Sequence, residues 1–145
     1  MIKLNHVYKT YPGPVHALSN VSVEIQKGEF VYLSGPSGAG KTTLFRLITC
    51  YDQVTSGDIS VVGYDLTRAS TSDLPLIRRK IGVVFQDFRL LKSRTVFANV
   101  ALPLEIIGQR RSEIAARVRE ALEQLGLRYK EDARPEHLSG GEQQR

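Results

Sequence analysis

The most informative stretch of this chain is Gly35-Pro36-Ser37-Gly38-Ala39-Gly40-Lys41-Thr42. It fits the pattern G-x-x-x-x-G-K-[ST], a phosphate-binding loop that joins a strand to a helix. Its glycines let successive backbone N–H groups converge on one anion, and the helix that follows adds unpaired N–H groups and the positive end of its dipole. We therefore predict that the loop binds the phosphates of a nucleoside triphosphate, namely ATP with Mg2+.

Both flanks of the loop have the expected character. Before it, the short apolar run at residues 30–33 predicts a strand that is buried on both faces. After it, apolar positions in residues 44–48 recur at helical spacing, so a helix is expected from Lys41. Lys41 should then reach the β- and γ-phosphates, and the Thr42 hydroxyl should take a magnesium position. The alternative is a chance glycine-rich turn, and the strand–loop–helix context argues against it.

Four other segments of the first 86 residues are predicted to form strands. Residues 1–11 and 17–26 alternate loosely in hydrophobicity and contain β-branched side chains, which predicts an antiparallel pair at the start of the chain. Residues 59–62 form another short strand candidate. Residues 81–85 are a second candidate for a buried strand, which ends at Gln86.

Beyond Gln86 the pattern becomes helical. Residues 95–107 are mostly apolar and predict a helix to about Leu102, where Pro103 should disturb it. Residues 112–125 predict the clearest helix, with Ser112 as its N-cap. Its apolar stripe consists of Ile114, Val118, Ala121, Leu122 and Leu125. A sheet with a crossover helix, followed by a helical subdomain, is α/β architecture.

A second motif stands near the end of the chain and reads Leu138-Ser139-Gly140-Gly141-Glu142-Gln143-Gln144-Arg145. Ser139 can cap a helix, and Glu142 three residues later completes a capping box. Gly140 and Gly141 leave the backbone amides open to an anion. The simpler interpretation is a capped helix after a loop.

Together, the two motifs resemble the ATP-binding cassette (ABC) ATPases, over the whole chain. The resemblance implies that the ATP-binding residues are Tyr11, Gly35, Pro36, Ser37, Gly38, Ala39, Gly40, Lys41, Thr42 and Thr43. Tyr11 would stack on adenine, as one aromatic ring can with little hydrogen-bond selectivity. Gln86 would act with Lys41 in catalysis, share the magnesium ion with Thr42, and sense a membrane partner.

The resemblance also implies a homodimer. Ser139, Gly140, Gly141 and Glu142 would contact the γ-phosphate of an ATP held on a second copy's loop, so that two chains enclose two ATP molecules. The simpler interpretations stay open for two of these residues. Gln86 is otherwise an ordinary polar residue at a strand end, and Tyr11 is otherwise a packing residue.

Within the family, four stretches are similar to the bacterial cell-division branch: Tyr11-Pro12-Gly13, residues 34–43, residues 84–91 and residues 94–104. That likeness implies a polytopic membrane partner, which would contact residues 87–100, and control of cell-wall hydrolases. The chain would then lie peripherally on the cytoplasmic face of the plasma membrane. Lipoprotein-release and macrolide-type exporters are the alternative.

The sequence departs from the family pattern at its C-terminal end. The resemblance implies an apolar strand ending in aspartate, a glutamate general base and a later histidine, and none of these follows Arg145. We therefore expect the first part of one nucleotide-binding domain, with part of its sheet missing. Its divisions would be an ATP-binding core at about 1–86, a helical subdomain at 87–138 and the start of the signature helix at 138–145. Such a piece should bind nucleotide but hydrolyse it weakly, which leaves a regulatory nucleotide-binding role open.

Composition and spacing argue against other classes. The net charge is +5, but the basic residues are scattered among acidic ones, apart from Arg78-Arg79-Lys80 and Arg110-Arg111, so nucleic-acid binding is not predicted. Cys50 is the only cysteine, which excludes an intrachain disulfide. A chromosome-maintenance ATPase would place long coiled coils in the interval 87–137, which is compact here. A GTPase would need an Asn-Lys-x-Asp motif, which is absent, and neither GTPases nor metabolic kinases need the second motif.

Overall fold

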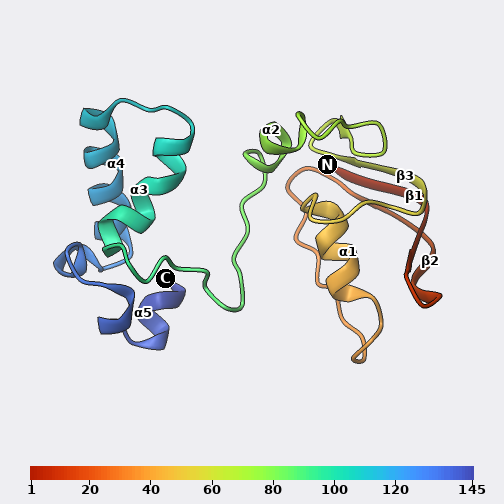
Figure 1. The fold of residues 1–145 in the computed structure, drawn as a ribbon, viewed down its shortest axis with the longest axis horizontal. Helices are drawn as coiled ribbons and strands as arrows, with labels where there is room; N and C mark the ends of the chain where they lie inside the picture. Colours follow the sequence, from red (N-terminus) through yellow and green to blue (C-terminus); the bar gives the residue numbers. More distant parts are fainter. The chain divides into compact units, whose positions relative to one another are not determined.

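Two units make up the fold, residues 1–83 and residues 84–145, and the computed structural model describes every residue from 1 to 145 (Figure 1). The first unit carries the sheet and the helix that follows the glycine-rich loop. The second unit is helical. None of the helices has the length and apolar character to span a lipid bilayer.

The sheet of the first unit has four antiparallel strands in the order β2-β1-β3-β4. The strands are β1 (Ile2–Tyr11), β2 (Val15–Ile25), β3 (Ser56–Val61) and β4 (Tyr64–Asp65). The antiparallel pair predicted at the start of the chain is confirmed. So is the short strand predicted near residues 59–62.

A bulge in β1 and β2 decides which side chains reach the core. His6 and Asn20 have φ angles of 48° and 55°, and the β1–β2 register shifts between Leu4 and Val7. The two irregular residues face each other, with 2.7 Å between His6 Nδ1 and Asn20 Oδ1. An extra residue in a strand reverses the alternation of faces. Leu4 and Val7 are therefore both buried, although regular alternation would put them on opposite faces.

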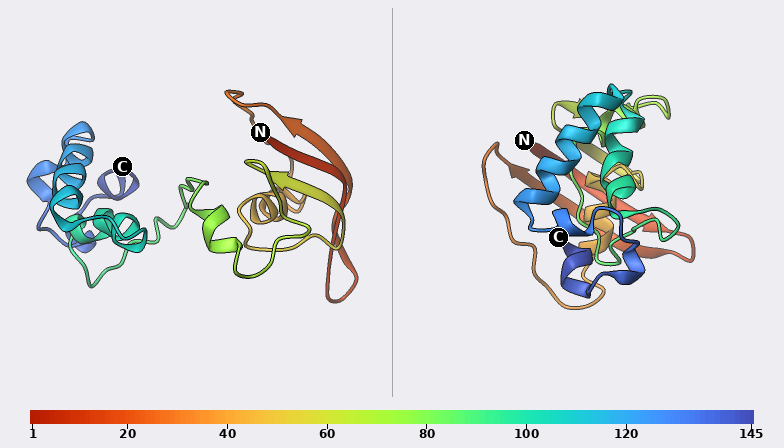
Figure 2. Two further views of the ribbon diagram at one scale, coloured as in Figure 1. Left: turned by 90° about the horizontal axis from the view of Figure 1, so that it is seen from above. Right: turned by 90° about the vertical axis from the view of Figure 1, so that its left-hand side faces the viewer.

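Helix α1 (Lys41–Ile48) lies against one face of this sheet (Figure 2). Leu47 is 1% exposed, and Leu44 and Ile48 pack beside it. The buried residues that they meet are Leu4, Val7, Leu18, Ile59 and Val61. The helix predicted from Lys41 is confirmed, and burying its apolar stripe joins the glycine-rich loop to the sheet.

A short helix, α2 (Leu74–Arg78), completes the first unit. Ile77 is fully buried, and Arg78 Nη2 donates to the Cys50 carbonyl oxygen at 2.6 Å. Burial raises the pKa of the Cys50 thiol, and the Arg78 charge opposes part of that shift. Cys50 is therefore a buried packing residue.

Two predicted strands do not form. Residues 30–33 and 81–85 take up no strand conformation and pair with none of β1–β4. Phe30 is 94% exposed, Tyr32 83% and Val84 82%. An apolar run becomes a strand only where another backbone segment satisfies its N–H and C=O groups. The prediction that both runs are buried strands is wrong for this structure, because no such segment lies beside them.

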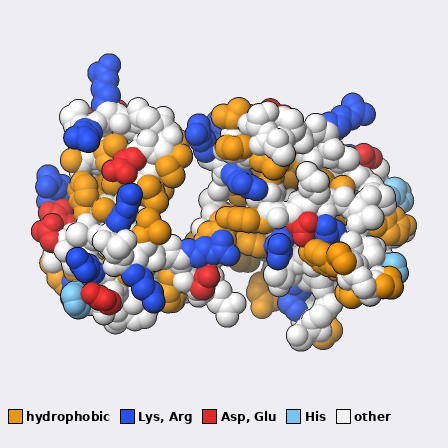
Figure 3. Space-filling view, in the orientation of Figure 1, with side chains coloured by type: hydrophobic (Ala, Val, Ile, Leu, Met, Phe, Trp, Pro, Cys, Tyr) orange, Lys and Arg blue, Asp and Glu red, His pale blue; other side chains and the backbone are white.

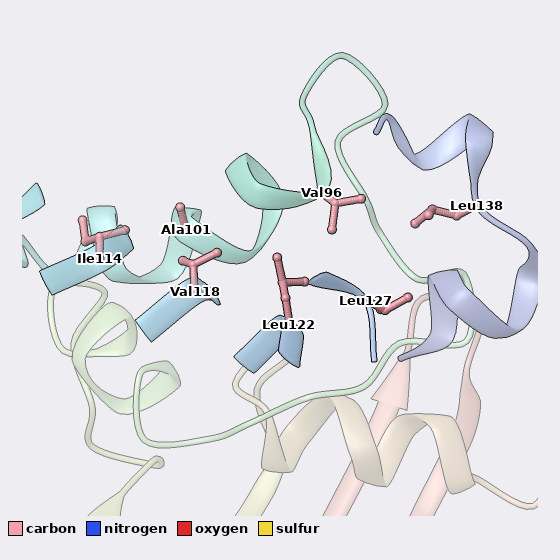
Figure 4. Packing of buried hydrophobic residues seen from close by; sticks show 7 residues of the cluster. All are labelled: Val96, Ala101, Ile114, Val118, Leu122, Leu127 and Leu138. Atoms are coloured by element: carbon pink, nitrogen blue, oxygen red, sulfur yellow. The ribbon is translucent and has the colours of Figure 1, made fainter. Parts of the chain in front are cut away.

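The second unit contains three helices and two short 3-10 turns. They are α3 (Val96–Ile106), α4 (Arg111–Gln124), η1 (Arg128–Lys130), η2 (Pro135–His137) and α5 (Gly140–Gln144). Figure 4 shows the core between them, built from Val96, Ala101, Ile114, Val118, Leu122, Leu127 and Leu138. Three members of the predicted stripe of α4, Ile114, Val118 and Leu122, face this core, whereas Leu125 is 42% exposed.

Two details of these helices differ from the predictions. Helix α3 continues through Pro103 to Ile106, and the Ile107 amide donates to the Pro103 carbonyl at 3.3 Å. Proline removes only its own N–H bond, and α3 keeps its packing against α4 on both sides of it. The N-cap of α4 is Arg110 rather than Ser112, because the backbone is still extended at Arg110 and already helical beyond it.

Candidate functional site

The glycine-rich loop contains left-handed backbone of the kind found in phosphate nests. Gly38 and Gly40 lie in the left-handed region, with φ angles of 81° and 85°. The Ala39 amide donates to the Pro36 carbonyl at 3.2 Å, which closes a turn within the loop. Residues 35–39 are exposed, and α1 starts immediately after Gly40. The loop therefore presents backbone and the start of a helix to solvent, as an anion site requires.

Gly40 also anchors the loop to the sheet. A Cβ atom at this position would lie 2.5 Å from the Ala17 carbonyl oxygen and 2.7 Å from Leu18 Cδ2. Ala17 and Leu18 belong to β2. Two independent constraints, the left-handed backbone and the contact with β2, thus require glycine here.

Lys41 folds back across the loop. Its Nζ donates to the carbonyl oxygens of Gly35 and Pro36, each at 2.7 Å. An ammonium has three donors, so it can exchange these neutral acceptors for charged phosphate oxygens with stronger hydrogen bonds. The first turn of α1 holds no acidic residue, so nothing on it repels an anion.

The residues near the loop fit a magnesium ion held mainly by phosphate. Thr42 is exposed in the first turn of α1, with Thr43 beside it. No group of three or more His, Cys, Asp or Glu side chains that could hold a metal occurs in the chain. Mg2+ typically uses one or two protein ligands together with substrate phosphates, and the Thr42 hydroxyl is a ligand of the right chemistry.

Tyr11 belongs to a cluster that the sequence analysis missed. Its hydroxyl donates to Asp52 Oδ2 at 2.7 Å, and Lys9 Nζ donates to Asp52 Oδ1 at 2.6 Å. The ammonium of Lys9 also lies 4.8 Å from the centroid of the Tyr11 ring. Asp52 follows α1 and lies 41 residues after Tyr11, so no local pattern could have linked the two.

Asp52 is ionised within this cluster. Burial alone would raise the pKa of its carboxyl group, but hydrogen bonds from Lys9, Tyr11 and the Gln53 amide outweigh burial and lower that pKa. The carboxylate therefore stays charged at neutral pH and keeps these three hydrogen bonds.

Strand β2 connects the tyrosine with the loop. Tyr11 pairs with Val15 at the end of the β1–β2 ladder, and Gly40 contacts Ala17. Two residues along a strand span about 7 Å. Tyr11, at the end of β1, and the glycine-rich loop therefore both contact the first half of β2.

Gln86 lies at an exposed turn in the second unit. The following residues, Phe88 and Arg89, have φ angles of 55° and 51°, a conformation uncommon outside glycine. Such backbone conformations are frequent at functional sites. The roles of Gln86 in catalysis and magnesium binding remain predictions.

The second motif forms the predicted capping box. Ser139 Oγ accepts from the Glu142 amide at 3.3 Å, and Glu142 Oε2 accepts from the Ser139 amide at 2.8 Å. Gly140 and Gly141 form the first turn of α5 and are exposed. The Tyr129 hydroxyl donates to Glu142 Oε1 at 2.8 Å, a support that the sequence analysis missed.

Hydrogen bonding gives Glu142 an unusual acidity. The Ser139 amide first, then the Tyr129 and Ser139 hydroxyls, lower the pKa of Glu142 to about 2. The hydrogen bond that the Tyr129 hydroxyl donates to Glu142 also raises the pKa of Tyr129. Glu142 is therefore an anion throughout the physiological range, and the capping box is intact there.

The fold and the loop define the class of protein. An exposed loop with left-handed glycines, a lysine that spans it and a helix that starts at its end have the arrangement of a phosphate-binding loop. The family model described as "ABC transporter" matches residues 18–145. The chain therefore belongs to the ABC transporter family, as the two motifs predicted.

Similar proteins agree with this assignment. The cell division ATP-binding protein FtsE of Bacillus subtilis is 50% identical over 145 residues, which cover all of this chain and 64% of the relative. FtsE of Mycobacterium tuberculosis is 48% identical over 146 residues, covering all of this chain and 64% of the relative. The methionine import ATP-binding protein MetN of Haemophilus influenzae is 47% identical over 148 residues, covering all of this chain and 43% of the relative.

A solved structure confirms the fold class. A dimeric ATP-binding cassette in a post-hydrolysis state, bound to ADP and Pi, matches with a TM-score of 0.88 and 38% identity. The match covers 99% of this chain and 65% of that one. The α/β cassette fold is confirmed, and the chain spans 43–65% of the length of these relatives and of the solved structure.

Proposed function

We propose that this chain binds Mg-ATP on loop 35–42, as part of the ATP-binding subunit of a membrane ABC complex that acts in cell division. The observation that carries the binding proposal is the geometry of the loop. Lys41 Nζ lies 2.7 Å from the Gly35 and Pro36 carbonyl oxygens, beside left-handed glycines and a helix start without acidic residues. A flexible positive charge beside exposed backbone and a helix start complements the negative charge of a polyphosphate.

Each predicted residue has a role in this proposal. The loop amides and Lys41 hold the β- and γ-phosphates, and Thr42 offers a ligand to Mg2+, with Gln86 as a second one. Bound Mg2+ neutralises charge that develops on the phosphates during transfer. The capped glycines of α5 present their amides to the γ-phosphate held by a second copy, which gives a homodimer. ATP hydrolysis by the whole protein belongs to the same proposal.

The role in cell division is proposed from the relatives. FtsE proteins from three species match the whole chain at 46–50% identity. We infer a polytopic membrane partner of the FtsX type, with the chain peripheral to the cytoplasmic face of the plasma membrane and ATP use coupled to cell-wall hydrolases. MetN proteins match at 47–50%, so methionine import is a second candidate.

The face shown in Figure 3 does not have the charge pattern of a nucleic-acid interface. On the face shown in Figure 3, lysine and arginine side chains are dispersed on each unit among acidic and hydrophobic ones. Nucleic-acid binding uses a continuous basic patch or stripe. We therefore propose no nucleic-acid partner.

Titration calorimetry with Mg-ATP tests the binding proposal. A charge-assisted hydrogen bond contributes about 1.5–3 kcal/mol, so Lys41→Ala should weaken ATP binding by about one to two orders of magnitude. Lys27→Ala removes an exposed lysine outside the loop and is the control. An affinity that Lys41→Ala changes by less than twofold would contradict the proposal.

Co-purification tests the choice between the two complexes. The chain should be retained by an FtsX-type membrane protein and not by a methionine-import permease. If only the methionine-import permease retains the chain, methionine import replaces cell division as the proposed role. Light scattering with and without Mg-ATP tests the homodimer, whose formation should depend on nucleotide and fail in Lys41→Ala.

A further inference from the structure

Tyr11, Lys9 and Asp52 form a cluster in the first unit where β1 meets the segment after α1, and Arg46 Nε lies 3.9 Å from Asp52 Oδ2 at its edge. Asp52 uses its two oxygens for different partners: Oδ2 accepts from the Tyr11 hydroxyl at 2.7 Å, and Oδ1 accepts from Lys9 at 2.6 Å. Lys9 Nζ is tied down further by the Gln53 carbonyl at 2.7 Å. The side chains of Lys9 and Asp52 are only 12% and 17% exposed, so water screens this ion pair weakly.

We propose that Lys9 and Asp52 are positioning residues that fix the Tyr11 ring for stacking on the base of a bound nucleotide. This proposal rests on the proposed function. It goes further by naming the residues that set the orientation of the ring.

The hydroxyl bond restricts the movement of the ring. A tyrosine at the end of a strand can otherwise turn about two side-chain torsions. With its hydroxyl held by Asp52, the ring keeps one plane. The Lys9 ammonium lies over one face of the ring, 4.8 Å from its centroid, so a base would stack on the opposite face.

Asp52 also links the ring to the helix that carries Lys41. It lies in the segment that directly follows α1, and the Asp52 amide donates to the Arg46 carbonyl at 3.2 Å. The loop stands at the start of α1, and the cluster holds its far end to β1. The ring and the loop are therefore fixed to the same rigid elements, as the two ends of one nucleotide require.

A purely structural cluster would hold β1 to the end of α1 without affecting the base. A structural role would affect the binding of ATP and of tripolyphosphate equally, whereas a ring-positioning role would affect only ATP. Inorganic tripolyphosphate has the phosphates of ATP but no base, so it reports on the loop alone. ATP reports on the loop and the ring together.

The experiment measures binding of Mg-ATP and of magnesium tripolyphosphate by calorimetry. The variants are Tyr11→Phe, which keeps the ring and removes the hydroxyl, Asp52→Asn, and the two combined. Asp65→Asn is the control, because Asp65 pairs with Arg68 on the exposed surface. Tyr11→Phe and Asp52→Asn should each weaken ATP binding about three- to tenfold, part of the stacking contribution of one aromatic ring. Tripolyphosphate binding should change less than twofold.

The double variant tests whether Asp52 acts through the hydroxyl. In the Tyr11→Phe background, Asp52→Asn should weaken ATP binding by less than a further twofold. Equal losses for ATP and tripolyphosphate, full additivity, or unchanged ATP binding would each overturn the positioning role. If Asp52→Asn does not fold, Tyr11→Phe alone decides by the same comparison of ligands. Wild-type chain that binds neither ligand would refute the proposed function itself.

Discussion

Replacing Gly40 by alanine tests how the nucleotide loop is held. Two separate costs follow from the structure. The φ angle of 85° lies in the left-handed region, which costs an L-residue about 1–2 kcal/mol. The new Cβ would also lie 2.5 Å from the Ala17 carbonyl oxygen, an overlap of the kind that costs about 1–3 kcal/mol. We therefore expect Gly40→Ala to lower the free energy of unfolding by about 2–5 kcal/mol.

Gly38 provides a matched control in the same loop. Its φ angle is 81°, and an added Cβ would meet nothing within 4 Å. Gly38→Ala should therefore cost only the backbone part, about 1–2 kcal/mol. Both substitutions restrict the unfolded chain equally, so this effect cancels between them. The difference between the variants isolates the contact with β2.

Urea denaturation followed by circular dichroism measures this difference. The free energy of unfolding should fall by about 1 kcal/mol per molar urea. The unfolding midpoint of Gly40→Ala should therefore lie about 1–3 M urea below that of Gly38→Ala. If Gly40→Ala is unfolded without urea while Gly38→Ala is folded, the expectation is also met. Midpoints that agree within about 0.5 M would refute the anchoring of the loop on β2.

Two further predictions concern the second unit. Leu122 is 2% exposed, so Leu122→Ala should cost about 2–5 kcal/mol of unfolding free energy in a urea melt, whereas Leu125→Ala, at a 42% exposed position, should cost far less. Because the pKa of Glu142 is lowered to about 2, its stabilisation should be complete above about pH 4.5 and disappear as the pH falls toward 2. Carbon NMR of the Glu142 carboxyl group should give a midpoint near 2 that rises in Tyr129→Phe and Ser139→Ala; a wild-type midpoint near 4.5 would contradict the capping box.

Local patterns in the sequence predicted the parts of the site that a few neighbouring residues build. Loop 35–42 and the start of α1 at Lys41 follow from glycine conformation and helix periodicity, which act over one or two turns of chain. The capping box of Ser139 and Glu142 is equally local, since its two bonds join residues three apart. The helix start and the capping box were confirmed because their partners are adjacent in the sequence. Phosphate binding by the loop stays a prediction.

Contacts between residues far apart in the sequence determined which apolar runs form strands and which side chains are buried. Residues 30–33 have the composition of a buried strand but lie exposed, because a strand also needs a neighbour and composition does not supply one. The bulge at His6 changed which side of β1 is buried.

The sequence alone indicated the family through its two motifs. It also predicted the helix start at Lys41 and the capping box, because short-range sterics and hydrogen bonding specify both. Only the tertiary structure joined Tyr11 to Asp52 and Gly40 to Ala17. Such contacts depend on how the sheet and α1 pack, and packing brings together residues whose separation along the chain carries no pattern.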